Sequence, residues 1–61
     1  MILWIARDVK GELELYDRKP NPLQGWFFPQ MGFGRLKLNE QLFPEVTFEN
    51  SPQEVELKLV K

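Results

Sequence analysis

Side chains that could act as nucleophiles are rare in this sequence. Ser51 is the only serine and Thr47 the only threonine, and the chain contains neither histidine nor cysteine. A nucleophilic hydroxyl needs a neighbouring base, which near neutral pH is usually a histidine. Because Ser51 stands before Pro52 in a turn-forming stretch, we expect its hydroxyl to bond the local backbone. We predict no catalytic residue.

A pair of carboxylates is the second arrangement that could do chemistry. Glu12 and Glu14 alternate along an expected strand, which puts them on one face roughly 7 Å apart. Such pairs serve as acid and base in glycosidases where a cleft shifts one pKa, but here we expect a solvated face. Gly32-Phe33-Gly34 resembles a phosphate-loop fragment without the strand and helix that such loops need. We predict that the protein is not an enzyme and takes no cofactor.

The composition is that of one small globular domain, residues 1–61. The hydrophobic share is 43% and the aromatic share 13%, which suffices for a compact core. Without cysteine the chain forms no disulfide, and without histidine it also lacks the commonest zinc ligands, so we predict no metal site. A domain this small must hold itself by apolar packing or by pairing with a second copy.

The charge balance argues against nucleic acid as a direct partner. Eight basic and nine acidic residues give a net charge of −1, whereas nucleic-acid-binding domains carry a basic face. The apolar run at 1–6 is too short to span a membrane and lacks the pattern of a secretory signal. We expect a cytoplasmic protein without a membrane segment.

Alternating apolar and polar residues predict a mostly β fold. The clearest element is a hairpin in which strands at 2–7 and 12–16 flank a turn at 8–11. Further strands are expected at 26–28, 35–38, 45–49 and 54–60. Short connections permit hairpins but not parallel crossovers. The expected fold is a single small antiparallel sheet or partly open barrel of five to six short strands.

Two stretches are expected to lie outside the strands. Residues 19–22 are expected to form a loop because Pro20 and Pro22 each lack an N–H and restrict the backbone. At most one short helical turn is expected near 39–43, capped by Asn39.

The same alternation assigns side chains to a buried face and a solvent-exposed face of the sheet. In the first hairpin, Leu13 and Leu15 face inward and Tyr16 faces outward. The later strands direct inward Val46, Phe48, Val55, Leu57 and Leu59. The aromatic residues assigned to the core are Trp4, Trp26, Phe28, Phe43 and Phe48.

Three large apolar side chains, Phe27, Met31 and Phe33, fit this core poorly because they alternate with core positions or stand beside glycines. In one interpretation the segment 25–34 folds over the core as a lid. In another it is a loop that binds a different protein or a second copy. The proposed partner-binding residues are Trp26, Phe27, Met31 and Phe33. A third interpretation, stacking of single-stranded bases, finds only two cations nearby.

An acidic surface is the alternative binding site. The residues concerned are Glu12, Glu14, Glu54 and Glu56, which form a negative stripe if their strands are neighbours. Such a stripe either solubilises the chain or attracts a basic partner by imitating a phosphate backbone.

Three stretches of the sequence also carry a resemblance. They are I-A-R-D-V-K-G-E-L-E-L-Y with Lys19-Pro20, the central Gly25-Trp26, and L-F-P-E-V-T-F-E-N-S-P-Q-E-V-E-L-K-L. Together they resemble a group of short uncharacterised proteins of Bacteroides-type gut bacteria and their phages or mobile elements. That group has a Trp-Trp pair where this chain has Trp26-Phe27, and a tryptophan in place of Phe48. The resemblance implies a phage-linked context without a mechanism, and small proteins in that context often bind a host protein.

Two functions from different classes follow as expectations. The first is a non-enzymatic β module that binds another protein, or itself as a homodimer, through the aromatic Gly-rich loop. The second is an acidic decoy that blocks a nucleic-acid-binding site on a host or defence protein.

Overall fold

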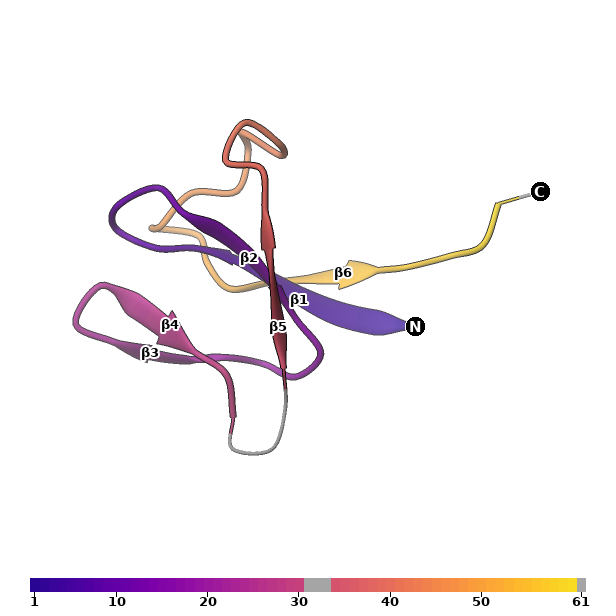
Figure 1. The fold of residues 1–61 in the computed structure, drawn as a ribbon, viewed down its shortest axis with the longest axis horizontal. Coiled ribbons are helices and arrows are strands. Elements are labelled where there is room, and N and C mark those ends of the chain that lie inside the picture. The colour runs from indigo at the N-terminus through magenta and orange to yellow at the C-terminus, as the bar shows by residue number, and fades with distance from the viewer. Residues whose placement is uncertain (31–33, 61) are drawn as a thin grey trace.

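The computed structural model describes residues 1–30 and 34–60, and within these ranges it contains six strands and no helix. The strands are β1 (Ile2–Arg7), β2 (Leu13–Tyr16), β3 (Asn21–Leu23), β4 (Trp26–Phe28), β5 (Arg35–Leu38) and β6 (Gln53–Glu56). Four of them form an antiparallel sheet in the order β5-β2-β1-β6, and β3 and β4 form a separate hairpin beside it (Figure 1). The predicted antiparallel β fold is confirmed, as two sheets rather than a barrel.

The turn between β1 and β2 depends on Asp8 and Gly11. One carboxylate oxygen of Asp8 accepts hydrogen bonds from the N–H groups of Lys10 and Glu12, at 2.9 and 3.0 Å. Gly11 has a φ of 92°, a conformation that residues with a side chain rarely adopt. These two residues confirm the predicted hairpin, because the Asp8 carboxylate satisfies two backbone N–H groups of the turn and Gly11 allows its positive φ.

The β3–β4 hairpin was not expected, because residues 19–22 were predicted to be a loop. Pro22 pairs with Phe27 in this hairpin, which is possible because β3 is an edge strand and needs no outward-facing N–H from the proline. Gln24 and Gly25 both have positive φ, as a two-residue hairpin turn requires. The hairpin docks on the first turn through a 3.0 Å hydrogen bond from the Val9 N–H to the Gly25 carbonyl.

One face of the four-stranded sheet is covered by this hairpin, and we call it the closed face. It carries Trp4, Ala6 and Tyr16, which pack with Phe27 of β4 and with Phe48. Tyr16 is only 1% exposed and Phe27 only 5%. The predictions that Tyr16 faces solvent and that Phe27 is left over are therefore wrong. Alternation along a strand separates its two faces. It does not reveal that a second hairpin buries the face that was predicted to be exposed to solvent.

The opposite face, which we call the open face, is covered only in part. Val46 is buried against Ile5 and Leu13 at one end of this face. The segment that brings Val46 there, residues 39–50, is irregular, so the strand predicted at 45–49 is wrong. Near 39–43 the chain makes a turn rather than a helix, and the Asn39 side chain accepts a 2.8 Å hydrogen bond from the Gln41 N–H.

One guanidinium group bonds several backbone carbonyls of the irregular segment. Arg7, the last residue of β1, directs its five N–H donors at five backbone carbonyls. The acceptors and distances are Val46 (2.6 Å), Gly11 (2.8 Å), Glu40 (3.0 Å), Leu42 (3.0 Å) and Phe43 (3.2 Å). Four of these carbonyls belong to residues 39–50, and that of Val46 lies within the stretch predicted as a strand.

Several residues assigned to the core are at the surface. Trp26, Phe28 and Phe43 are each more than a third exposed. β6 ends at Glu56, four residues before Val60, where the predicted strand was expected to end. Leu57 and Leu59, expected to face inward, lie in solvent. The chain is too short to cover both faces of the sheet along their whole length.

A search for membrane-spanning helices among residues 1–30 and 34–60 finds none that is long and apolar enough.

Replacing Arg7 with lysine keeps the positive charge but removes the planar five-donor fork. We expect Arg7→Lys to lower the free energy of unfolding by about 2–3 kcal/mol, because an ammonium group cannot satisfy carbonyls from several turns at once. Urea denaturation followed by tryptophan fluorescence measures the loss. Arg35→Lys is the matched control, since Arg35 makes a surface ion pair with Glu14, and its cost should stay below about 1 kcal/mol. Equal losses in the two variants would contradict this role for Arg7.

Burial on the closed face, with the negative charge of Glu14 nearby, raises the pKa of Tyr16 from 10.0 to about 12. The folded chain therefore holds this proton more tightly than the unfolded chain. The stability that Tyr16 contributes is complete below pH 10 and is lost as the pH rises towards 12. Tyr16 is the only tyrosine, so tyrosinate absorbance should titrate near pH 12 in the folded chain. The step should be absent in Tyr16→Phe, and a folded-state midpoint near the ordinary value of 10 would refute the assigned burial.

Candidate functional site

The aromatic loop predicted from the sequence is only partly assembled by the described residues. Phe27 lies in the core, where its ring meets that of Phe48 edge-on at 6.1 Å between centroids. Trp26 is at the surface, with the Lys10 ammonium 5.1 Å from its ring centroid. Met31 and Phe33 lie outside the described residues. The described part of the loop therefore offers Trp26 as an accessible anchor but not Phe27.

The predicted acidic stripe is divided by the strand order. β1 lies between β2, which carries Glu14, and β6, which carries Glu54 and Glu56. The condition for the stripe, neighbouring strands, is therefore not met.

The acidic residues of the first hairpin are moreover paired with cations of β5. Glu12 lies 3.0 Å from the Lys37 ammonium, and Glu14 lies 3.4 Å from the Arg35 guanidinium. The hydrogen bond and the charge of Glu12 raise the pKa of Lys37 above its ordinary value. These contacts place alternating charges, and not a negative field, along this edge of the sheet.

The two hydroxyl residues are used by the backbone. The Ser51 hydroxyl accepts a 2.9 Å hydrogen bond from the Arg7 N–H and donates one to the Thr47 carbonyl. The Thr47 hydroxyl accepts from the Asn50 N–H at 3.3 Å. The structural role predicted for Ser51 is thus confirmed. The described residues also contain no group of three or more acidic, histidine or cysteine side chains that could hold a metal ion.

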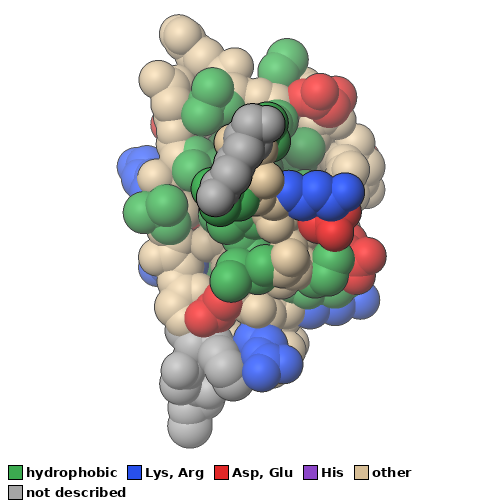
Figure 2. Space-filling view, turned by 90° about the vertical axis from the view of Figure 1, so that its right-hand side faces the viewer, with side chains coloured by type: hydrophobic (Ala, Val, Ile, Leu, Met, Phe, Trp, Pro, Cys, Tyr) green, Lys and Arg blue, Asp and Glu red, His purple; other side chains and the backbone are tan. Residues whose placement is uncertain are grey.

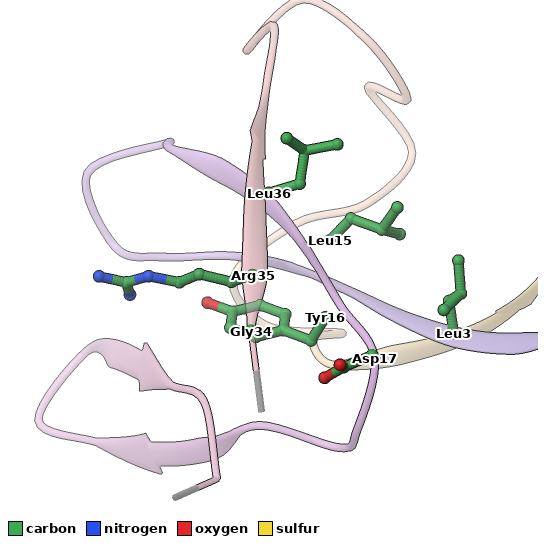
Figure 3. Close-up of a pocket in the computed structure, with 7 residues that line it drawn as sticks. All are labelled: Leu3, Leu15, Tyr16, Asp17, Gly34, Arg35 and Leu36. Carbon is green, nitrogen blue, oxygen red and sulfur yellow. The ribbon is translucent and has the colours of Figure 1, made fainter. Parts of the chain in front are cut away.

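The described structure has a hollow on the open face. Pairing between strands aligns its leucines, because Leu36 stands opposite Leu15, and Leu3 stands opposite Val55. Figure 3 shows Leu36, Leu15 and Leu3 following one another across β5, β2 and β1. They follow the row of apolar positions that the alternation predicted.

Two adjoining hollows make up the site. The larger, which we call the apolar groove, has a volume of about 410 Å³. It is lined by Leu3, Ile5, Leu15, Leu38, Phe43, Val55, Glu56 and Leu57. The smaller, of about 200 Å³, shares Leu3 and Leu15 with it and reaches towards Asp17 and Arg35 (Figure 3). Seen from the side towards which β6 runs, hydrophobic side chains gather in the middle of the surface and charged ones at its margin (Figure 2).

Phe43 stands at one wall of the groove in a strained conformation. Its φ is 48°, which is unusual for a bulky residue and costs on the order of 1 kcal/mol. The Phe43 carbonyl is held from two directions, by the Arg7 guanidinium at 3.2 Å and by the Val46 N–H at 2.9 Å. The ring nevertheless remains half exposed. The fold therefore holds the Phe43 ring at the groove, although the partial burial of this ring offsets only part of the backbone strain.

Reasoning from the sequence placed the surplus apolar surface in the aromatic loop, whereas the structure places much of it on the leucines of the open face. A signal for this exists in β1. Both the odd and the even positions of Ile2–Ala6 are apolar, so both faces of the sheet require a cover. In the described part of the chain, one hairpin and one irregular segment provide it.

Comparison of the chain with protein-family models, with curated proteins and with solved structures finds no match. The candidate site is therefore defined by its geometry alone.

The surface leucines of the open face should contribute little to stability. Leu36 is 61% exposed, whereas Leu13 on the same face is 0% exposed. We expect Leu36→Thr, which keeps a high strand propensity, to change the free energy of unfolding by less than about 1 kcal/mol. Leu13→Ala should cost about 2–5 kcal/mol because it leaves a cavity. Urea denaturation compares the two, and similar losses would show that Leu36 belongs to the core and not to a surface site.

Proposed function

We propose that this chain is a binding module without catalytic chemistry, which holds an apolar segment of another protein against its open face. The observation that carries the proposal is the apolar groove of about 410 Å³, in which Glu56 is the only charged residue of the lining. Contiguous apolar surface of this kind on a small domain typically marks an interface with another protein.

The lining favours a protein segment over a small polar ligand. Sites for small molecules orient their ligand through a few converging polar groups. The groove offers apolar side chains from β1, β2 and β5, from Val55 of β6 and from Phe43, while the side chain of Glu56 lies on the closed-face side. The complementary segment therefore presents apolar side chains to the groove.

The strained backbone at Phe43 supports the same assignment. Residues held in sparsely populated conformations concentrate at binding and active sites, where the surrounding structure enforces them. A partner that buries the exposed half of the Phe43 ring would gain apolar contact from it. The function of the Arg7 guanidinium, in this proposal, is to keep Phe43 in place before the partner arrives.

The partner's biological source follows only from the resemblance to short proteins of gut bacteria and their phages. A host protein is the partner that this context favours, and the association is by analogy. The aromatic loop around Trp26 remains the competing surface, because Trp26 is accessible in the described structure.

A selection from a random peptide display library against the full chain tests the proposal. We expect the selected peptides to be rich in apolar residues, and their affinity to fall about 10- to 100-fold on Phe43→Asn, because a half-buried ring is lost. Asparagine tolerates positive φ, so the fold should keep its stability within about 1 kcal/mol. Trp26→Ser is the matched aromatic control and should leave the affinity unchanged.

Three outcomes would contradict the proposal. Peptides whose binding depends on Trp26 and not on Phe43 would assign the function to the aromatic loop. Peptides whose binding is abolished by salt and by Glu12→Lys would assign it to the acidic surface. A fluorescent fatty acid that fills the groove, with no peptide able to displace it, would identify a lipid ligand instead of a protein.

A further inference from the structure

The two edges of the four-stranded sheet differ in what they present to solvent. β6 forms one edge, and residues 57–60 continue from it beyond the sheet (Figure 1). Leu57 still pairs with the start of β1, exchanging hydrogen bonds with Met1 at 2.8 and 3.2 Å. Leu59 and Val60 have no such cover, and Leu59 is 84% exposed. An edge strand that ends in an exposed apolar segment is a template for pairing with another chain.

The direction of the edge hydrogen bonds follows from the pairing with β1. In an antiparallel ladder, residues turn their backbone groups alternately towards and away from a given neighbour. Because Leu57 bonds to Met1, the backbone groups of Glu54, Glu56 and Lys58 point away from β1, towards the free edge. The side chains of these three residues lie on the closed-face side, while those of Val55 and Leu57 lie on the open-face side.

We propose that two copies of this chain pair antiparallel through β6 and residues 57–60, with a two-fold axis at Leu57. The inference goes beyond the proposed function and rests on different observations, since it needs the free edge and not the groove. The joined sheet is continuous across the two copies.

The register with Leu57 at its centre is complementary along its length. Glu56 of each copy stands opposite Lys58 of the other, so the dimer contains two opposite-charge pairs. Val55 stands opposite Leu59 of the second copy, and Leu57 stands opposite Leu57. The outward-facing backbone groups of Glu56 meet those of Lys58, as a hydrogen-bonded pair requires. Within one copy the same two side chains form an exposed ion pair at 3.5 Å, which the dimer exchanges for contacts between copies.

Neighbouring registers are excluded by charge or by the faces of the sheet. Centring the axis on Glu56 places two carboxylates directly opposite each other, and centring it on Lys58 does the same with two ammonium groups. A slip of one residue sets apolar side chains against charged ones and misaligns the hydrogen bonds. Only the register centred on Leu57 avoids both faults.

The other edge, β5, resists the same pairing. Its sequence Arg35-Leu36-Lys37 places two cations opposite each other whichever of the three residues lies on the axis. The carboxylates of Glu14 and Glu12 are not available to offset the repulsion between copies, because they already pair with Arg35 and Lys37 of their own chain. Lysine and arginine on an edge strand commonly prevent edge-to-edge association. One edge therefore blocks self-pairing and the other permits it, so that association closes at a dimer.

Dimerisation also changes the open face. Val55 and Leu57 line the apolar groove, and in the joined sheet Leu59 of the second copy lies beside Val55. The two grooves become neighbours on one continuous apolar surface, and each gains a side chain from the other copy.

Sedimentation velocity on the full chain between about 5 and 500 µM tests the proposal, because a short ladder forms a small interface, which is typical of weak association. We expect a concentration-dependent shift from monomer to dimer. Glu56→Lys and Lys58→Glu should each weaken the dimer about tenfold or more, since both replace two attractive pairs with two repulsive ones. The double variant with both charges exchanged should dimerise like the original chain.

A mixture of the two single variants gives the sharpest result. Each carries two like charges on its edge and should be monomeric alone, yet the mixture should form a heterodimer in which each lysine faces a glutamate. A chain that stays monomeric over the whole concentration range would overturn the proposal, as would single variants that dimerise unchanged or a double variant that does not recover. Phe43→Asn should leave the dimer intact, so its effect on peptide binding reports separately on the proposed function.

Discussion

The fold depends on the five hydrogen bonds that the Arg7 guanidinium donates to backbone carbonyls. Residues 39–50 form no strand, so no sheet ladder is available for the carbonyls of Glu40, Leu42, Phe43 and Val46, to which Arg7 donates instead. A planar group with five donors reaches several turns of an irregular segment at once, which neither lysine nor a strand can do. Through Val46 and Phe43 this one side chain positions both the cover of the open face and the wall of the groove.

The shortness of the chain explains why the two faces of the sheet are covered to different extents. The β3–β4 hairpin closes one face with Phe27 and leaves Tyr16 almost fully buried. The other face is covered mainly by Val46, because residues 39–50 form turns that are bonded to Arg7 and do not extend across the sheet. A 61-residue domain has a large surface for its volume. The apolar groove is a part of the sheet that residues 1–30 and 34–60 leave without a cover, and a partner protein or a joined second copy is a physical means of covering it.

Charge placement determines what each part of the surface permits. On the β5 edge, Arg35 and Lys37 neutralise Glu14 and Glu12, so the acidic residues of the first hairpin do not act as a negative field. On the β6 edge, a charged residue flanks Leu57 on each side, and the two residues, Glu56 and Lys58, have opposite charges. The two edges thus differ because β5 carries two cations, one on each side of Leu36, whereas the β6 edge carries one anion and one cation, one on each side of Leu57.

The sequence by itself determined the elements whose stabilising contacts are local. The hairpin of β1 and β2 follows from alternation and from Asp8 and Gly11, and β4 and β5 lie where the apolar pattern predicts them. Only the tertiary structure decided which faces are dry, since alternation cannot show that a hairpin containing Pro22 covers Tyr16. It also decided that 45–49 is not a strand and that Glu14 and Glu54 lie apart. Both outcomes depend on contacts between residues distant in sequence, the first on Arg7 and the second on the order of the strands.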